Sequence, residues 1–338
     1  MSGLRDTVAA AYRNVASFQA ASTVRASAHA LNVGYTPDEL QRAPDLVQLG
    51  LSCGNPISQA DLQTGEVVLD LGSGAGFDVL LAAAQVGHCG KVYGVDFVPE
   101  MVARVRLTAM SSGCSNVEFR LGDIEDLPID SNSIDCVISN CTFNLLIGKE
   151  RALREILRVL KPGGRIALLE TVLLNPLPED VAASQELYTC CVSGALQKAE
   201  YLRLLRQAGF SDADISLGQD LTSVFVDERN WRSESSLGIS VVAPDNDVVA
   251  GALIRARKSA AAAAPVSPEP PLLAVLGVPN NLGAKLEGCG VDVVFLNAGD
   301  RPPTRRGKMT TRTSIPYFCA NSKSRSSCAG TDMMAPVP

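Results

Sequence analysis

The stretch Val67–Gly76 constrains the fold of this chain more than any other part of it. It begins with apolar residues, contains the acidic residue Asp70, and ends in alternating glycines at positions 72, 74 and 76. A short apolar run that stops at glycines predicts a buried parallel strand followed by a tight turn. The Ala-rich run Phe77–Val86 then predicts a helix, whose N-terminus offers free N–H groups to a ligand that approaches the glycine backbone.

The spacing of these glycines narrows the class of ligand. Gly-x-Gly-x-Gly differs from the Gly-x-Gly-x-x-Gly fingerprint of dinucleotide-binding proteins, and these glycines are not followed by the Lys-Ser or Lys-Thr pair of a P-loop. Together with Asp70, the pattern resembles motif I of the class I S-adenosylmethionine (SAM)-dependent methyltransferases. That resemblance implies a Rossmann-like fold that binds SAM. The weaker alternative is a nucleotide-binding turn of another kind.

Strands and helices alternate along the predicted core. This alternation favours an α/β, doubly wound parallel sheet with helices on both faces, which binds its ligands outside the carboxyl ends of the strands. A turn at Lys161–Gly164 is expected before the fifth strand. The expected strands are Val67–Leu71, Lys91–Asp96, Val117–Leu121, Ser133–Asn140 and Arg165–Glu170, and the expected helices are Phe77–Val86, Pro99–Ser111 and Lys149–Leu160.

The segments that flank this core divide the chain into four predicted parts. Residues 1–62 form an N-terminal helical, capping segment, with Thr36 as the N-cap of its third helix and Pro37 at the first helical position. Residues 63–175 form the SAM-binding core, and 176–258 form a segment that completes the acceptor site and the core. Residues 259–338 combine a Pro-rich linker with a low-complexity tail that is expected to be disordered from Arg301 to Pro338.

Further elements are expected outside the core. Apolar residues at helical spacing predict two helices before the one that starts at Pro37 and two more after the core, and apolar runs predict strands in the second half of the chain. The expected helices are Leu4–Ala20, Ser22–Asn32, Val181–Ala195 and Glu200–Gln207, and the expected strands are Ile215–Leu217, Thr222–Val226, Val248–Arg257, Leu272–Val278 and Val291–Asn297.

Composition excludes several classes of partner. The 338 residues carry a net charge of −6, which gives no reason to expect nucleic acid or an anionic membrane surface as a partner. No run approaches the roughly 20 apolar residues of a membrane span, and no secretory signal is evident, so a cytoplasmic location is expected. The ten cysteines include no Cys-x-x-Cys pair and only two histidines are present, which argues against structural zinc and leaves few candidates for a general base.

Polar residues at the ends of the predicted strands are the candidates for binding the cofactor. Asp96 closes the second strand about 20 residues beyond the glycine turn, where a carboxylate can accept hydrogen bonds from ribose hydroxyls. By resemblance to the methyltransferases, Asp123 is expected at the adenine amino group, with Ile124 against the ring. The predicted cofactor-binding set is Asp70, Gly72, Ser73, Gly74, Gly76, Asp96, Met101, Asp123, Ile124 and Asn140.

Three cysteines are candidates for an acceptor site. Cys53 lies in a Cys-Gly-Asn-Pro turn before the core, Cys141 directly follows the fourth strand, and Cys191 lies in the segment added after the fifth. A single cysteine is most often a small buried hydrophobe, which is how Cys89, Cys114 and Cys136 are interpreted, and Cys190 is expected to point away from Cys191. Spacing alone leaves open whether Cys53, Cys141 and Cys191 share a site.

Six segments resemble the arsenite methyltransferases, in a match that runs from about Leu31 to Gly218 and extends towards Lys258. The family implies that Cys53, Cys141 and Cys191 hold trivalent arsenic, a soft centre that prefers thiolates, and that SAM methylates it for arsenic detoxification. It also implies a thiol reductant such as glutathione or thioredoxin. The segments are Cys53–Pro56, Val68–Asp78, Gly94–Met101, Asn116–Glu125, Ile138–Cys141 and Cys191–Ala195.

The chain departs from that family in its N-terminal region. Many members carry a further cysteine there, whereas Ala20–Ser27 has none, so its role is either missing or supplied by free thiols such as glutathione. Two alternatives therefore stay open beside arsenite methylation. One is methylation of a small organic acceptor such as a quinone or sterol, and the other is a non-catalytic protein that binds arsenic or senses SAM.

Overall fold

The computed structural model describes residues 2–17, 23–44, 47–111, 114–220, 249–260, 273–276 and 293–296. The chain separates into two compact units, residues 1–263 and 264–338, and each is described by itself. Within the described residues, no helix is long and apolar enough to cross a membrane.

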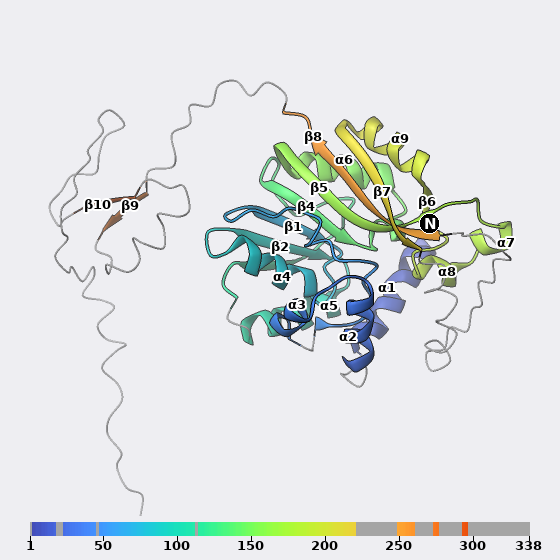
Figure 1. Ribbon diagram of the computed structural model, residues 1–338, viewed down its shortest axis with the longest axis horizontal. Coiled ribbons are helices and arrows are strands. Elements are labelled where there is room, and N and C mark those ends of the chain that lie inside the picture. The colour runs from blue at the N-terminus through green and yellow to red at the C-terminus, as the bar shows by residue number, and fades with distance from the viewer. Residues whose placement is uncertain are drawn as a thin grey trace, which may run out of the picture. The chain divides into compact units, whose positions relative to one another are not determined.

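A single mixed sheet forms the centre of the first unit, in the order β3-β2-β1-β4-β5-β8-β7, with the short strand β6 paired to β5. Strands β1 to β5 are parallel, whereas β8 runs antiparallel between β5 and β7 (Figure 1). The bounds are β1 Val67–Leu71, β2 Lys91–Asp96, β3 Val117–Leu121, β4 Ile134–Asn140, β5 Leu160–Leu173, β6 Leu196–Gln197, β7 Phe210–Asp220 and β8 Val249–Lys258. The predicted doubly wound α/β fold is confirmed.

The order of the strands reverses at β1. The chain passes from β1 to β2 and β3 on one side of it, and then returns to place β4 on the other side. Loops that leave β1 and β4 in opposite directions open a crevice at the carboxyl end of the sheet, where ligands bind in folds of this type. The glycine turn and Cys141 both follow strands at this point.

Alternating side chains of the strands pack on two layers of helices. Val68, Cys136 and Ile138 belong to a buried cluster with α4 (Phe77–Val86) and α5 (Pro99–Ser111). Leu69 and Val137 point to the opposite face, against α6 (Lys149–Val159) and α9 (Lys198–Ala208). This period of two explains why the strands read as continuous apolar runs, because both of their faces are buried.

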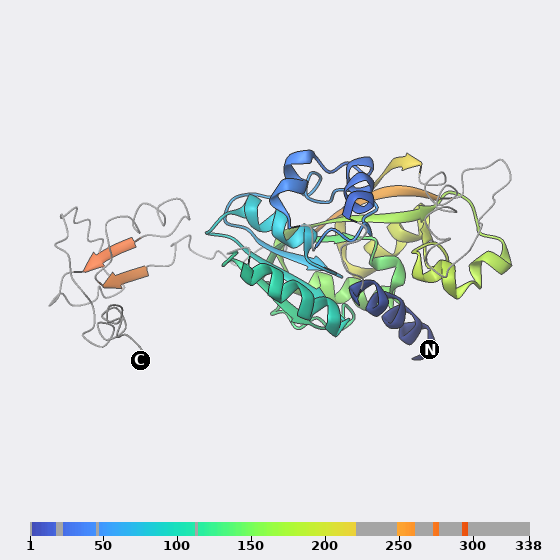
Figure 2. The same cartoon turned by 90° about the horizontal axis from the view of Figure 1, so that it is seen from below.

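The N-terminal helices occupy two places. Helices α2 (Thr23–Asn32) and α3 (Pro37–Arg42) lie beside α4, whereas α1 (Ser2–Ser17) lies apart from them beside α5 (Figure 2). Thr36 caps α3 in a capping box with Glu39, as predicted. Helix α1 is held by an ion pair between Arg13 and Glu100 and by a hydrogen bond from Arg104 to the carbonyl of Ala16.

The segment after β5 differs from its predicted form. The single helix expected over Val181–Ala195 is wrong, because the chain forms two short helices, α7 (Glu179–Ala182) and α8 (Gln185–Thr189), and then a turn. The hydroxyl of Ser184 accepts a hydrogen bond from the amide of Leu187 and so starts a new helix. Cys191 has a φ of 62°, which no α-helix accommodates.

The strands also differ from expectation at their ends. Strand β5 begins at Leu160 and not at Arg165, because the predicted turn at Lys161–Gly164 is a bulge within the strand, which pairs with β4 on both sides of it. Strand β7 is longer than Ile215–Leu217, and the strand predicted at Thr222–Val226 lies outside the described residues.

In the second unit, β9 (Leu273–Leu276) and β10 (Val293–Leu296) form a parallel pair. Both strands fall within predicted strands. The predicted linker and the disordered tail Arg301–Pro338 lie outside the described residues. The four-part division of the chain stays a prediction.

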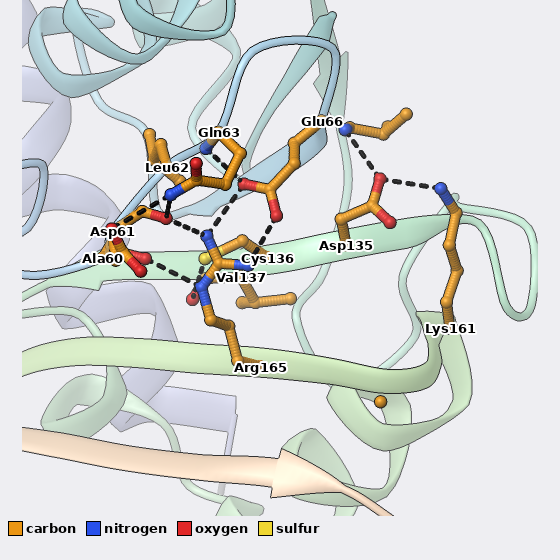
Figure 3. A network of polar contacts seen from close by, with 12 residues as sticks. Ala60, Asp61, Leu62, Gln63, Glu66, Asp135, Cys136, Val137, Lys161 and Arg165 are labelled. Carbon is orange, nitrogen blue, oxygen red and sulfur yellow. Dashed lines mark hydrogen bonds and ion pairs between the residues drawn. The ribbon is translucent and has the colours of Figure 1, made fainter. Parts of the chain in front are cut away.

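At the amino ends of the strands, a polar network ties the loop before β1 to the neighbouring strands (Figure 3). Arg165 on β5 donates to both carboxylate oxygens of Glu66, at 2.6 and 2.8 Å, and to the carbonyls of Ala60 and Asp61. The side chains of Arg165 and Glu66 are each only 16% exposed. A partly buried, bidentate pair contributes more than a surface pair because solvent screens it less.

The substitution Arg165→Met is therefore expected to lower the free energy of unfolding by about 2 kcal/mol, because it removes the guanidinium that pairs with Glu66 and donates to two carbonyls. Urea unfolding measures the change. Arg203→Met is the matched control, since Arg203 pairs with Glu200 on the exposed face of α9 and its loss should leave the unfolding midpoint near that of the wild type. Equal effects of the two substitutions would contradict this account.

Candidate active site at the carboxyl edge of the sheet

The glycine turn after β1 opens onto the crevice at Gly74. Its φ is 50°, and a Cβ atom placed there would meet nothing within 4 Å. A Cβ at Gly76 would instead overlap Val105, so Gly76 allows α4 to pack closely on α5 and does not face the crevice. Between them, the hydroxyl of Ser73 is the one buried side-chain polar atom in the described residues that lacks a hydrogen-bond partner. An unpaired buried hydroxyl beside an open glycine is suited to a polar ligand.

Three buried carboxylates surround this turn. Burial raises the pKa of Asp70 well above its usual value, and the charges of Asp78 and Asp96 raise it further. Burial also raises the pKa of Asp78 to about 6, although hydrogen bonds from Tyr35 and Asn140 oppose the shift. The pKa of Asp96 is raised by burial and lowered by the amides of Val98 and Gly74. Repulsion among these carboxylates makes the turn favourable for a positively charged ligand.

A cavity of about 470 Å³ lies in front of the turn, within the size range of about 300–1,000 Å³ usual for small-molecule sites. A smaller cavity of about 80 Å³ adjoins it and shares Gly72, Gly74 and Asn140 with it. Most of the predicted cofactor residues line one or both cavities: Asp70, Gly72, Ser73, Gly74, Asp96, Asp123, Ile124 and Asn140.

Two predicted cofactor residues are placed elsewhere. Gly76 and Met101 line neither cavity. Met101 lies in the first turn of α5, and its apolar side chain is buried, with only 1% exposed. In this structure Met101 is therefore a buried residue outside both cavities.

Asp123 is engaged by the protein itself. One of its carboxylate oxygens accepts from the guanidinium of Arg5 on α1, and the other accepts from the amide of Glu125. The guanidinium of Arg5 also lies 5.8 Å from the centre of the Phe97 ring. An adenine amino group at Asp123, as the sequence predicts, would have to share this carboxylate with Arg5.

Asn140 links the end of β4 to the turn that carries Cys53. Its Oδ1 accepts from the amide of Cys53 at 2.8 Å, and its Nδ2 donates to the carbonyl of Gly54 at 2.8 Å. The same Nδ2 contacts Asp78 at 3.2 Å, and Asp78 accepts from the hydroxyl of Tyr35 at 2.7 Å. Asn140 thus positions the Cys53 turn as well as facing both cavities.

The three candidate cysteines meet at the end of β4. Cys53 and Cys141 form a disulfide with their Cα atoms 6.0 Å apart, and the thiol of Cys191 donates to the carbonyl oxygen of Cys141 at 2.8 Å. The structure therefore brings the predicted trio together, but two of its members are oxidised and not free thiolates. In this form no cluster of three or more His, Cys, Asp or Glu side chains suited to a metal ion occurs in the described residues.

The other cysteines divide by burial. Cys136 lies fully buried in the core, as predicted, and burial raises its pKa to about 12. Cys114 is half-buried and packs against the core cluster, whereas Cys89 is half-buried and belongs to neither of the main core clusters. Cys190 is half-buried where its neighbour Cys191 is buried, which agrees with the expectation that the two point in different directions.

The backbone is strained at two of the three site cysteines. Cys141 has a φ of 56° and Cys191 a φ of 62°, in the left-handed region. For a residue other than glycine this conformation costs roughly 1–2 kcal/mol and persists only where surrounding contacts impose it. Both side chains are buried, and burial, together with the charge of Glu170, raises the pKa of the Cys191 thiol well above its usual value.

Glu170 and Asn144 hold these strained segments, and neither was predicted as a site residue. The carboxylate of Glu170, 1% exposed, accepts from the backbone amides of Thr142, Phe143 and Asn144 at 3.1, 2.9 and 3.4 Å. Burial raises its pKa to about 7. Lys149 lies near it, and burial lowers the pKa of that amine to about 8.

Some of the missed residues carry a signal in the sequence. Glu170 is an acidic residue near the carboxyl end of a buried strand, the same signal that identified Asp96. Asp78 is a buried acid in the first turn of an apolar helix. In contrast, Arg5 and Tyr12 line the large cavity from α1, and only the packing of α1 on α5 and α8 brings them there.

The stability of the protein should depend on pH through Glu170. Its pKa is near 4.5 in an unfolded chain and about 7 in the folded one, so the folded state binds more protons between these values. The stability of the wild type relative to Glu170→Gln should therefore fall as pH rises from about 4.5 to about 7, by at most about 3 kcal/mol. Denaturant unfolding of both proteins across this range measures the difference. A difference that stays constant with pH would contradict the assignment.

Comparisons with known proteins agree with this architecture. A family profile described as a methyltransferase domain matches residues 62–209. Phosphoethanolamine N-methyltransferase 2 of Haemonchus contortus, solved with SAM, is 18% identical, with 62% of this chain and 53% of that chain covered and a TM-score of 0.50. At this identity the likeness shows the fold.

More similar sequences carry a more specific name. The arsenite methyltransferase of Halobacterium salinarum is 41% identical over 228 residues, which are 68% of this chain and 56% of that protein. The solved arsenic(III) SAM methyltransferase of Chlamydomonas reinhardtii is 30% identical, with 69% of this chain and 73% of that chain covered and a TM-score of 0.49. This chain thus spans little more than half the length of the first of these relatives. By sequence, it belongs to the arsenite methyltransferase family within the class I SAM-dependent methyltransferases.

Proposed function

We propose that this chain transfers the methyl group of SAM to trivalent arsenic held by Cys53, Cys141 and Cys191, as a step in arsenic detoxification. One observation carries the proposal. Cys141 lines the same cavity as Gly74 and Asp96, and the other two cysteines meet at Cys141 from separate parts of the chain. A donor site and a soft acceptor site therefore adjoin each other.

The donor side of the cavity fits SAM in its charges and its shape. SAM supplies, when bound, an electrophilic methyl group on a sulfonium centre. Asp70 and Asp96 would balance the positive charges of that molecule, and Asp96, which lines the larger cavity, would accept from ribose hydroxyls. The open backbone at Gly74 and the unpaired hydroxyl of Ser73 leave space and a hydrogen-bonding group for its polar end.

The acceptor side requires reduction before arsenic can bind. A thiol reductant such as glutathione, or a protein thiol of the thioredoxin type, would supply two electrons and two protons to the Cys53–Cys141 disulfide. Three thiols then replace the three hydroxide groups of arsenite, and each S–H proton leaves with one hydroxide as water. The raised pKa of Cys191 suits this exchange because the proton stays on sulfur until it is needed. The cytoplasm suits it too, since its thiol pools keep cysteines reduced.

The residues of the site then act mainly by orientation. Arsenic bound by three sulfurs carries its lone pair on the side away from them, so no protein base has to remove a proton. Asn140 fixes the backbone at Cys53, Glu170 fixes the backbone that follows Cys141, and together they set the direction of that lone pair. Positioning of this kind accounts for a large part of the rate in bimolecular transfers. The low polarity of the cavity wall at Leu145 and Leu146 favours loss of the sulfonium charge.

The direct test incubates the reduced protein with arsenite, glutathione and SAM labelled in its methyl group. Methylated arsenic is the expected product, and Cys53→Ser, Cys141→Ser and Cys191→Ser should each reduce its rate of formation by about 100-fold or more, since each loses a bond that orients the arsenic. Cys114→Ser is the matched control and should react as the wild type does, because Cys114 lies outside the cavity.

Other outcomes distinguish the alternatives. SAM binding without methylated arsenic would overturn the proposal. If Cys141→Ser methylated a quinone or sterol as fast as the wild type, the chain would be a methyltransferase of an organic acceptor. Tight arsenite binding with no product in a single turnover would instead indicate an arsenic-binding protein.

A further inference from the structure

The Cys191 turn has little regular structure to hold it. It follows α8, which has five residues, and leads into β6, which has two. Its backbone amides bond back to α8, that of Cys191 to Tyr188 and that of Val192 to Leu187, and the hydroxyl of Ser193 donates to the carbonyl of Val181 on α7. Local structure alone therefore does not determine how far Cys191 lies from Cys141, which follows a central strand of the sheet.

Asn144 connects the two segments directly. Its Nδ2 donates to the carbonyl of Thr171 on β5 at 2.6 Å and to the carbonyl of Cys191 at 3.3 Å, and its Oδ1 accepts from the hydroxyl of Tyr201 at 2.7 Å. Asn144 and Tyr201 are fully buried. Both amide hydrogens and the amide oxygen are thus used, which the carboxylate of an aspartate could not reproduce because it has no hydrogen to donate.

The backbone of Asn144 is fixed from the other side. Its amide donates to Glu170, and its carbonyl accepts from Lys149. The Cys191 turn also packs directly against that carbonyl, because a Cβ atom placed at Gly194 would overlap the oxygen of Asn144. Asn144 is therefore held within the Cys141 loop while it sets the position of the turn that carries Cys191.

We propose that Asn144 is a positioning residue that places Cys191 against the Cys53–Cys141 pair, so that the site binds trivalent arsenic through three sulfurs and not two. This inference rests on the proposed function. Asn144 touches neither arsenic nor cofactor in this account, and it acts through the carbonyl of Cys191. Without it, Cys53 and Cys141 would still form a two-sulfur site, because their contact comes from Asn140 and the end of β4.

Two arsenicals separate these cases. Arsenite can bond to three sulfurs, whereas phenylarsine oxide keeps its phenyl group and bonds to two. The variants are Asn144→Leu, which removes the amide at similar volume, and Gly194→Ala, whose added methyl group pushes the Cys191 turn away from Asn144 while the Asn144 side chain stays intact. Asn116→Leu is the matched control, because the Nδ2 of Asn116 also bridges two carbonyls, those of Ala83 and Gly87, far from the cysteines in the fold.

Binding of both arsenicals is measured on the full chain after reduction with a phosphine, which adds no competing thiol. Asn144→Leu and Gly194→Ala should bind phenylarsine oxide within about threefold of the wild type but arsenite at least about tenfold more weakly, close to Cys191→Ser. Asn116→Leu should bind both as the wild type does. Thermal unfolding and SAM binding verify the fold of each variant, and Gly194→Ala carries the test should Asn144→Leu fail to fold.

The outcomes separate this inference from the function on which it rests. Folded variants that keep wild-type affinity for arsenite would overturn the role of Asn144, as would an equal loss of both arsenicals, which is the result expected of a purely structural residue. A wild-type protein that binds arsenite no better than Cys191→Ser does would overturn the three-sulfur site itself.

Discussion

The parallel pairing of β1 with β2 on one side and β4 on the other is the constraint on which the site depends. In this register Asp70 lies opposite Gly94 on β2 and Ile138 on β4, so the carboxyl ends of all three strands reach one edge. The glycine turn, Asp96 and Cys141 then fall around a single cavity.

Buried polar groups account for how the acceptor loops keep their shape. A buried carboxylate or amide is costly unless its hydrogen bonds are made, and Glu170 and Asn144 make theirs to the backbone of the loops that carry the cysteines. The same contacts sustain the positive φ values of Cys141 and Cys191. The strained backbone at the two cysteines lowers the stability of the protein but gives the sulfurs a defined arrangement. Strain of this kind is common at functional sites.

Much of the fold could be predicted because the core strands are buried on both faces and end at glycine or acidic residues. Strand β1 and helix α4 begin and end where the sequence predicts. The structure of residues 181–195 could not be predicted, because their apolar spacing suits one helix. Ser184 instead caps a new helix, and Cys191 adopts a left-handed turn. The roles of Arg5 and Asn144 arise from packing between distant segments of the chain. The hydrophobic periodicity of a sequence does not indicate which distant segments pack together.

The central claim is that the three cysteines converge on one soft ion beside the methyl donor. Arsenic X-ray absorption spectroscopy of the reduced protein loaded with one equivalent of arsenite measures this most directly, because it counts the atoms bonded to arsenic. The account predicts three sulfur neighbours and no oxygen, and one sulfur fewer in Cys191→Ser. Two sulfurs and one oxygen in the wild type would contradict it.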